Sequence, residues 1–498
     1  MAKKIKQSSH KRALPRRASR FPVKIEYINE KGHGVAFYQG HKLNVPKTLP
    51  GEQVLVEYDP TRPRKDRIHL IKILETSPHR QTPPCQYFDE CGGCHLQHMD
   101  YALQQTLKRQ IIERQLAAYP ILKPLAVAPV SGMPEPLHYR NKCQMPFQEQ
   151  GGTVVYGLYR SGTHQLIPVE ECLVETRDAN AALKIVKQWA EQYRVPVYDE
   201  ITREGILRHL VVRKGMFTNQ VMVILVVKSR EITVLPRLLQ ALKYGLPALH
   251  SVYLNIQPDP VNTILGEENI LMWGEPYIEE QIGRLRFRIY PHTFFQVNSV
   301  QTVKLLEQLL RTTPLEGTDV VLDLYSGVGT VALYIAPRVK QVIGIEADSR
   351  AVHAANENAE NNQVRNVQFI AGVVEKRLAE FLTIYQPHVV VVDPPRKGLH
   401  PDVVQALLNY PPKQLVYISC NPKTLARDLA LLMEGGYKGN KIYPFDMFPQ
   451  TAHVESLITL EFGGNPSNLT SGSGQIPGDT KTVSGSKEED KNPANPGE

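Results

Sequence analysis

The sequence predicts a multidomain protein with a small N-terminal β-barrel, an α+β central region that holds a cysteine cluster, and a C-terminal Rossmann-like α/β domain with a mostly parallel sheet. Short alternating strands separated by Gly and Pro predict the barrel. Apolar strands that alternate with amphipathic helices over residues 317–462 predict the parallel sheet. The length of 498 residues supports this division, because it exceeds what one ordinary hydrophobic core accommodates.

The N-terminal arm, residues 1–16, is basic. Residues 1–20 contain eight Lys and Arg and no acidic residue, so the net charge of +8 comes from this end of the chain. We expect a disordered arm that contacts phosphate by releasing counterions. The alternative is a solvated tail that only aids solubility.

The barrel is expected over residues 17–76. Val23, Ile25 and Tyr27 alternate with charged residues, and Pro50-Gly51 marks a turn. Basic residues cluster near its end, namely Arg62, Arg64, Lys65 and Arg67. The segment resembles a TRAM domain, which is an OB-like RNA-binding barrel; this likeness implies contact with RNA.

Membrane insertion and secretion are not expected. The longest uninterrupted apolar run, Val221–Val227, is far shorter than the roughly 20 residues of a membrane helix. The N-terminus lacks the apolar core of a secretion signal. Six cysteines are too few for a disulfide scaffold in a chain of this length, so we expect a cytoplasmic protein. We also favour a monomer.

The central domain, residues 77–285, opens with the cysteine cluster Cys85-x5-Cys91-x2-Cys94. Three soft ligands on one loop predict a metal site, and Cys143 and Cys172 are the candidates for a fourth ligand. From spacing alone zinc is a rival, with His95 or His98 as a nitrogen ligand. The pattern also predicts a helix over 101–118, which we expect near the catalytic domain, and a hairpin over 205–228.

The C-terminal domain, residues 286–463, carries a nucleotide-site pattern. Gly327 and Gly329 follow an apolar strand and precede a helix, and Glu346 ends the next strand, where a carboxylate can bind both ribose hydroxyls. No Gly-Lys-Ser/Thr follows the glycines, and the dinucleotide fingerprint is incomplete. A nucleoside ligand without phosphates fits better, and we expect S-adenosylmethionine. The alternative is a packing turn in an unrelated α/β fold.

The strands of this domain are expected at its buried apolar runs: Val320–Tyr325, Val342–Glu346, Val367–Ile370, Val389–Asp393, Leu415–Ser419 and Val454–Leu460. Asp393 ends one of them in Asp-Pro-Pro-Arg396. An aromatic residue after the prolines would suggest methylation of an exocyclic amine. Arg396 stands there instead and indicates a different acceptor atom. Residues 464–498 are expected to be a disordered tail.

Cys420 is the candidate nucleophile. It follows a predicted strand and precedes Asn421-Pro422, which are favoured at the start of a helix. The free N–H groups and the dipole at a helix N-terminus favour a thiolate. A methyltransferase needs such a thiolate when the acceptor is carbon 5 of a pyrimidine, which is a poor nucleophile by itself. Addition of the thiolate to carbon 6 makes carbon 5 nucleophilic, so that it can attack the activated methyl group. A buried, inert cysteine is the alternative.

A base must then remove the proton from carbon 5. Glu455, in His453-Val-Glu455 on the last predicted strand, is the best-placed carboxylate by topology, and His453 is the second candidate. The target base must leave its stack to reach these groups.

These motifs together resemble the RNA uracil-5-methyltransferase family, in the order Phe295-Gln296-Val297-Asn298, the Gly-x-Gly turn, Asp-Pro-Pro-Arg, Ser-Cys-Asn-Pro and His-Val-Glu. The resemblance covers about residues 17–463. It implies a class I methyltransferase fold, cofactor contacts from Gln296, Tyr325, Glu346 and Asp393, a nucleophile at Cys420 and a base at Glu455. Thr330 stands where some members carry Asn.

The branch of this family with a TRAM domain looks similar at the cysteine cluster. This likeness implies a [4Fe-4S] cluster held by Cys85, Cys91, Cys94 and Cys172, with Cys143 structural. It also implies structured RNA as the partner, most of all 23S rRNA, with 5-methyluridine as the product.

Three other functions stay open. The first is formation of 5-methyluridine in tRNA. The second is a radical methylthiotransferase, although such enzymes use Cys-x3-Cys-x2-Cys and here the first gap is five residues. The third is a non-catalytic RNA-binding assembly factor, which the intact Cys420 and Glu455 disfavour.

Overall fold

The computed structural model describes residues 14–15, 17–63 and 67–463. The expected arm, apart from Leu14 and Pro15, and the expected tail at 464–498 lie outside these ranges, as do Arg64 and Lys65 of the basic cluster. None of the helices within the described ranges is long and apolar enough to cross a membrane.

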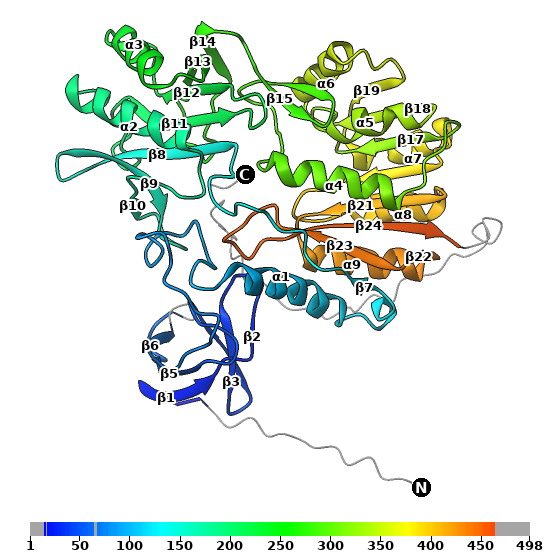
Figure 1. Cartoon of the computed structure of the whole chain (residues 1–498), viewed down its shortest axis with the longest axis horizontal. Coiled ribbons are helices and arrows are strands. Elements are labelled where there is room, and N and C mark those ends of the chain that lie inside the picture. The colour runs from blue at the N-terminus through cyan, green and yellow to red at the C-terminus, as the bar shows by residue number, and fades with distance from the viewer. Residues whose placement is uncertain (1–13, 16, 64–66, 464–498) are drawn as a thin grey trace, which may run out of the picture.

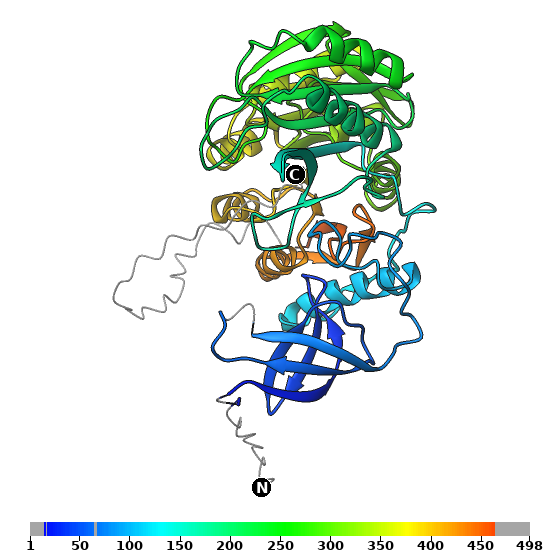
Figure 2. The same ribbon diagram turned by 90° about the vertical axis from the view of Figure 1, so that its left-hand side faces the viewer.

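Two three-stranded antiparallel sheets make up the N-terminal domain, which lies at the bottom of Figures 1 and 2. Burial alternates along β1 and β5, and both sheets contribute to a shared apolar core around Val23, Ala36 and Val54. Among the described residues the strands thus pair as two sheets around one core, and the closed barrel stays a prediction. The strands are β1 (Ser19–Lys24), β5 (Gln53–Tyr58) and β6 (Ile68–Glu75), and β2 (Tyr27–Ile28), β3 (Gly34–Tyr38) and β4 (His41–Val45).

A seven-stranded sheet forms the central domain, in the order β10-β9-β8-β11-β12-β13-β14. Helices α2 (Arg177–Gln192) and α3 (Leu235–Gly245) contribute to the apolar core of this domain. The predicted hairpin is confirmed as antiparallel β11 and β12, and β12 is buried along its whole length, which explains its apolar run. The strands are β8 (Lys142–Gln150), β9 (Thr153–Tyr159), β10 (Leu166–Pro168), β11 (Leu207–Lys214), β12 (Val221–Val227), β13 (Leu249–Ile256) and β14 (Glu268–Gly274).

The C-terminal sheet follows the order β19-β18-β17-β20-β21-β24-β23-β7. Its first five strands are parallel, and β24 runs antiparallel to both of its neighbours, β21 and β23, so the mostly parallel sheet is as expected. These strands are β17 (Val320–Leu324), β18 (Gln341–Glu346), β19 (Val367–Ala371), β20 (Val389–Val392), β21 (Gln414–Ser419), β22 (Tyr437–Gly439), β23 (Lys441–Phe445) and β24 (Glu455–Phe462). The helices are α4 (Ser299–Thr312), α5 (Thr330–Ile335), α6 (Ser349–Asn361), α7 (Val374–Tyr385), α8 (Pro401–Asn409) and α9 (Pro422–Glu434).

The two large domains share one apolar core. Val211 and Ile224 of the central sheet pack in the same cluster as Val321 and Leu333 of the C-terminal domain. The expected boundary at 285/286 falls inside the hairpin of β15 (Ile278–Ile282) and β16 (Leu285–Ile289), which belongs to this shared core. Hydrophobic periodicity does not reveal such a boundary, because both strands are buried in the same way.

The segment before the central sheet also contacts the C-terminal domain. Helix α1 (Tyr101–Leu116), the helix predicted over 101–118, packs near α9, and β7 (Ala126–Val127) pairs in parallel with β23. Lys108 of α1 is fully buried and forms an ion pair with Asp446, which follows β23. This segment therefore supports the chain that leads into β24.

Candidate active site

The turn after β17 has the backbone that the Gly-x-Gly pattern predicts. Gly327 and Gly329 have φ of 53° and 82°, and a Cβ at Gly329 would lie 2.6 Å from the Phe369 ring, so only glycine fits. Tyr325 also has a positive φ, of 64°, which is uncommon for a residue with a side chain. Backbone strain of this kind concentrates at functional sites.

Two carboxylates hold this turn in place. The backbone N–H of Gly327 donates to Glu346 Oε2 at 3.0 Å, and that of Ala332 donates to Asp323 Oδ2 at 3.0 Å. Burial raises the pKa of Asp323 to about 8.

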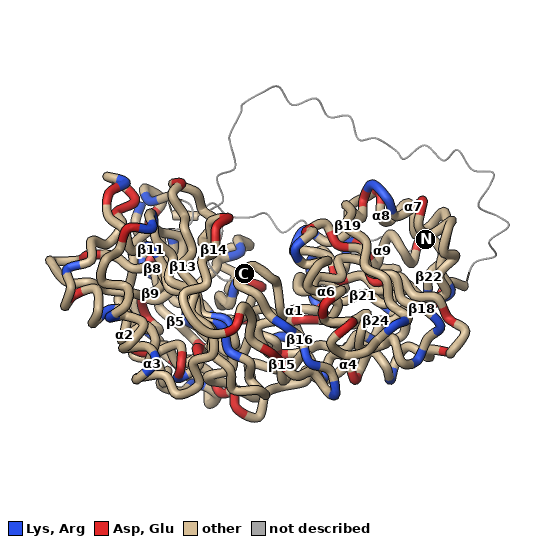
Figure 3. Tube along the Cα trace, turned by 90° about the horizontal axis from the view of Figure 1, so that it is seen from above, with Lys and Arg blue, Asp and Glu red and all other residues tan. Residues whose placement is uncertain are grey.

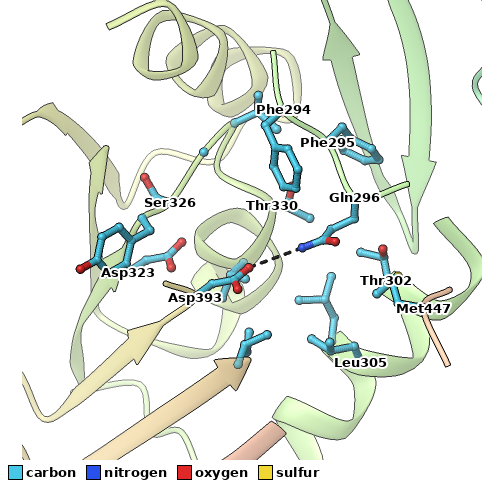
Figure 4. Close-up of a pocket in the computed structure, with 16 residues that line it drawn as sticks. Phe294, Phe295, Gln296, Thr302, Leu305, Asp323, Ser326, Thr330, Asp393 and Met447 are labelled. Atoms are coloured by element: carbon cyan, nitrogen blue, oxygen red, sulfur yellow. Dashed lines mark hydrogen bonds between the residues drawn. The ribbon is translucent and has the colours of Figure 1, made fainter. Parts of the chain in front are cut away.

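A cavity of about 580 Å³ opens at the carboxyl ends of β17 and β20 (Figure 4). Its lining includes the predicted cofactor residues Gln296, Tyr325, Gly327 and Asp393, and also Thr330. The side-chain amide of Gln296 donates to Asp393 Oδ2 at 3.5 Å across the cavity. This volume includes space open to solvent, and the cavity lies where doubly wound sheets bind their ligands.

The cavity also uses residues that the sequence did not single out. Phe294, Ser326 and Met447 line it. The hydroxyl of Ser326 is buried and has no hydrogen-bond partner among the described residues, so it is available to a polar ligand. Ser326 lies inside the predicted turn and could have been named. Met447 comes from a distant segment, and nothing in the sequence marks it.

Cys420 follows β21 at the N-terminus of α9, as predicted. The Asn421 side chain accepts from the Lys423 N–H, so it caps the helix, and its amide donates to the carbonyl oxygen of Arg396 at 2.9 Å. Thr424 Oγ1 donates to the same carbonyl at 3.4 Å. The loop of Cys420 is thus tied to the loop that follows Asp393. Ile418 lines the cofactor cavity, and Cys420 lies just outside it.

The pairing of β21 with β24 brings the chain at Glu455 and the chain at Cys420 to the same end of the sheet. Ser419 of β21 pairs with Ser456 of β24 in the last pair of the antiparallel ladder, and Cys420 and Glu455 are the residues that adjoin this pair. The two residues are 35 apart in the chain, since 455 − 420 = 35, and only the pairing of these strands makes them neighbours.

Asp393 and Glu455 influence each other. Burial raises the pKa of Asp393 to about 7. Burial also raises the pKa of Glu455 well above its usual value, the charge of Asp393 adds to this shift, and Arg396 opposes it. A carboxylate with a raised pKa is a stronger base, which suits proton abstraction.

His453, the second candidate base, is less suited to that task. Burial lowers its pKa to about 3, and His95 and Arg396 add to the shift, so its ring is a weak base. The rings of His453 and His95 meet edge to face, with centroids 5.9 Å apart. The cysteine loop that carries His95 therefore reaches the neighbourhood of Glu455.

The cysteine loop packs on the central sheet. The N–H of Gly92 donates to the carbonyl oxygen of Tyr159 at 3.1 Å, and a Cβ at Gly92 would lie 2.8 Å from that oxygen. Burial raises the pKa of Cys94 to about 12, and the charges of Cys91 and Cys85 add to the shift. Cys94 in turn acts on Cys172. Within residues 14–463 as described, no three His, Cys, Asp or Glu side chains form a group that could hold a metal ion.

The zinc alternative places His95 or His98 among the ligands. His95 Nδ1 accepts from the Ala452 N–H at 3.4 Å, which turns this ring toward the C-terminal domain. His98 packs on Phe88, with ring centroids 5.4 Å apart.

Cys143 is buried in β8, beside Glu175.

Known proteins that are similar to this chain agree with the site geometry described above. A model of the tRNA (uracil-5-)-methyltransferase family matches residues 266–462. An uncharacterized RNA methyltransferase of Halalkalibacterium halodurans is 38% identical over 91% of this chain and 98% of its own. The chain belongs to the RNA uracil-5-methyltransferase family.

Other relatives support this assignment. An uncharacterized RNA methyltransferase of Caldanaerobacter subterraneus is 39% identical over 89% of this chain and 98% of its own. The crystal structure of a Pyrococcus abyssi tRNA (uracil-54, C5)-methyltransferase in complex with S-adenosyl-L-homocysteine is similar with a TM-score of 0.71 and 28% identity. It covers 88% of this chain and 100% of its own.

Membership of the RNA uracil-5-methyltransferase family makes the protein an RNA methyltransferase that uses S-adenosylmethionine. The cavity fits this cofactor, since the glycine turn and the unpartnered Ser326 hydroxyl line it, while Glu346, which holds that turn, is not itself among the lining residues. The family assignment speaks against the radical methylthiotransferase and the non-catalytic alternatives.

Proposed function

We propose that this methyltransferase forms 5-methyluridine in 23S rRNA through a covalent bond between Cys420 and carbon 6 of the target uracil. The observation that carries the proposal is the pairing of β21 with β24, whose last pair, Ser419 and Ser456, adjoins both Cys420 and Glu455, while Glu455 also feels the charge of the cavity residue Asp393. Carbon 5 methylation requires a nucleophile that reaches carbon 6 and a base that reaches the proton on carbon 5.

Each residue has one role. The Cys420 thiolate adds to carbon 6, and the electron pair of the carbon 5–carbon 6 double bond moves toward the carbon 4 carbonyl, so that carbon 5 becomes nucleophilic. Bound S-adenosylmethionine supplies the methyl group that carbon 5 takes up. Glu455 then removes the proton from carbon 5, the double bond forms again and the carbon 6–sulfur bond breaks. Gln296 and Asp393 bind and orient the cofactor, and Arg396 stabilises ionised Glu455.

The choice of 23S rRNA is supported by the likeness of the N-terminal strands to a TRAM domain and by the cysteine pattern. A tRNA substrate is the second candidate, because the matching family model and the Pyrococcus abyssi relative both carry tRNA in their names. The basic residues Arg62 and Arg67, at the edge of the N-terminal domain, supply positive charge for either RNA.

Recombinant full-length protein tests the function directly. It is incubated with labelled cofactor and either an unmodified 23S rRNA transcript or unmodified tRNA transcripts, and the product nucleoside is identified by mass spectrometry and mapped. We expect 5-methyluridine in the rRNA. Transfer to tRNA alone would overturn the choice of substrate, and a different methylated nucleoside would overturn the chemistry.

Cys85, Cys91, Cys94 and Cys172 are proposed to hold a [4Fe-4S] cluster, with zinc as the alternative. Four thiols match the ligand number of either site, and Cys94 feels the charges of Cys91 and Cys85 and acts on Cys172, although no three of them form a metal-holding group among the described residues. The group would order the loop that carries His95. Iron, sulfide and zinc contents of anaerobically purified protein decide between the two, with Cys143→Ser as the control for Cys172→Ser.

A further inference from the structure

A second pocket lies in the central domain, away from the cofactor cavity. It encloses about 320 Å³, part of it open to solvent, between β8, β9, β10, β11 and the loop before β11. Its lining includes Tyr159, Tyr198, Glu200, Arg208 and His209. None of these residues belongs to the chemistry described above.

The floor of this pocket holds polar groups whose hydrogen bonds are incomplete. Arg208 Nε, the Tyr198 hydroxyl and His209 Nδ1 are buried and have no hydrogen-bond partner among the described residues. Tyr198 is 4% exposed and Arg208 2% exposed. Three such atoms around one pocket call for a partner from outside the chain, water or a polar ligand, because buried polar groups are nearly always satisfied.

Arg208 is rigidly held. Its Nη1 donates to the carbonyl oxygens of Gln257 and Asp259, at 2.7 and 2.6 Å. Its guanidinium lies over the Tyr198 ring, with Cζ 4.4 Å from the centroid. Nη1 is thus engaged by backbone carbonyls, and Nη2 lies 3.7 Å from Glu200 Oε1. Nε is left for a ligand.

The rim of the pocket differs from its floor. Glu200 is exposed and adds an acceptor, and the next residue, Ile201, is 91% exposed, which is unusual for a large apolar side chain. The pocket has donors on its floor, a carboxylate at its mouth and an apolar side chain beside it. The donors and the carboxylate match the edge of a nucleobase, and the apolar side chain matches its face. Proteins read unstacked RNA bases in this way, by hydrogen bonds to the edge and contact with the face.

The position of the pocket also suits RNA. His209 lies on the same face of β11 as Val211 and Arg213, because side chains alternate along a strand. Arg213 binds the carbonyl oxygens of Tyr290 and Pro291, just before the cavity residues Phe294 and Gln296. Four residues of strand separate His209 from Arg213, or about 13 Å. Figure 3 shows β8, β9 and β11 together on one side of the molecule, with β18, β21 and β24 on the other.

We propose that this pocket is a second nucleotide subsite, which takes the edge of an unpaired base of the RNA substrate, with guanine preferred. Guanine presents two adjacent N–H donors to the Glu200 carboxylate, while O6 and N7 accept from Arg208 and Tyr198. The subsite rests on RNA as the substrate, and it gives the central domain a part in choosing the sequence around the target.

Fluorescence anisotropy with short labelled RNAs tests the subsite. Full-length protein carrying Cys420→Ala is titrated with oligouridine and with the same oligomer carrying one central guanosine, adenosine or cytidine. We expect the guanosine oligomer to bind about fivefold or more tightly than oligouridine. Binding does not depend on methyl transfer, so a failure of the proposed reaction would leave this result intact.

Two conservative changes and a control locate the effect. Glu200→Gln is at an exposed position, and Tyr198→Phe removes a hydroxyl that has no partner, so both are expected to fold. Each should abolish most of the preference for guanosine, while Glu204→Gln, an exposed residue of the same loop, should keep it. Equal binding of all four oligomers, or a preference that survives both changes, would overturn the proposal. Tighter binding of every oligomer by Glu200→Gln would indicate a phosphate site and overturn it as well.

Discussion

The side-chain amide of Asn421 donates a hydrogen bond of 2.9 Å to the carbonyl oxygen of Arg396. This contact joins the loop of Cys420 to the loop of Asp393, which follow neighbouring parallel strands of the sheet. The same side chain caps α9 through its oxygen. One residue therefore both starts the helix behind the proposed nucleophile and sets its distance from the cofactor cavity.

Replacements of Asn421 separate these two tasks. Asn421→Asp keeps the capping oxygen but cannot donate to Arg396, whereas Asn421→Ala loses both contacts and about 1 kcal/mol of helix-cap stability. We expect both variants to form the covalent RNA adduct about tenfold more slowly, and only Asn421→Ala to unfold at clearly lower denaturant. Normal adduct formation by Asn421→Asp would show that the contact with Arg396 does not position Cys420.

Cys420→Ala removes the proposed nucleophile. Turnover should fall by at least about 10³-fold, because no other group can add to carbon 6. Cofactor binding should persist, since Cys420 does not line the cavity. Labelled methyl transfer, calorimetry with S-adenosylhomocysteine and denaturing gels of the RNA adduct measure the three quantities. Residual turnover near the wild-type rate would refute the covalent route.

Glu455→Gln keeps the shape of the proposed base and removes its ability to accept a proton. Methyl transfer to carbon 5 should still occur once, but the carbon 6–sulfur bond cannot break while the carbon 5 proton remains. We therefore expect methylated RNA that stays bound to the protein on a denaturing gel. Glu461→Gln, at an exposed position of the same strand, should turn over normally. Release of free methylated RNA by Glu455→Gln would assign the base elsewhere.

The pH dependence should reveal the interaction between Asp393 and Glu455. Glu455 acts as a base only when ionised, so activity should rise with pH. The Asp393 charge raises the pKa of Glu455, and Asp393→Asn removes that charge, so the acidic limb of the profile should move to lower pH. Single-turnover rates at saturating cofactor measure this movement separately from weaker cofactor binding. An acidic limb that stays in place would mean that another group controls it.

The buried pair of Lys108 and Asp446 should support the chain before β24. Lys108 Nζ also donates to the carbonyl oxygen of Phe448 at 3.0 Å, and Asp446 accepts from the Tyr101 hydroxyl at 2.9 Å. Lys108→Met leaves a buried carboxylate without its cation, which should cost about 3–5 kcal/mol of unfolding free energy. The double variant Lys108→Met/Asp446→Asn should recover most of this loss in urea denaturation. A single variant as stable as the wild type would show that the pair is not needed.

Local patterns predicted much of the C-terminal domain. The apolar runs at 320–325 and 415–419 became β17 and β21, and the turn at Gly327 and Gly329 took the positive φ that only glycine adopts easily. The capping pair Asn421-Pro422 starts α9. These features depend on neighbours within a few residues, so the sequence is sufficient to show them.

Other features escaped the sequence because they depend on contacts between distant segments. Met447 reaches the cofactor cavity, and β7 extends the C-terminal sheet from a position before the central sheet. The pocket around Arg208 and Tyr198 gathers residues from four strands and a loop, none of which carries a motif. Burial of an arginine is also invisible to hydropathy, since its cause is the set of backbone carbonyls that fold around it.

The sequence by itself determined the residue types of the active site and the order of the elements that carry them, because strand, turn and cap preferences act over short range. Tertiary structure alone decided that the segments carrying Cys420 and Glu455 meet at the last pair of β21 and β24, and that Asp393 raises the pKa of Glu455. Register between β21 and β24 and exclusion of water from the site are properties of the packed sheet, and no short segment contains them.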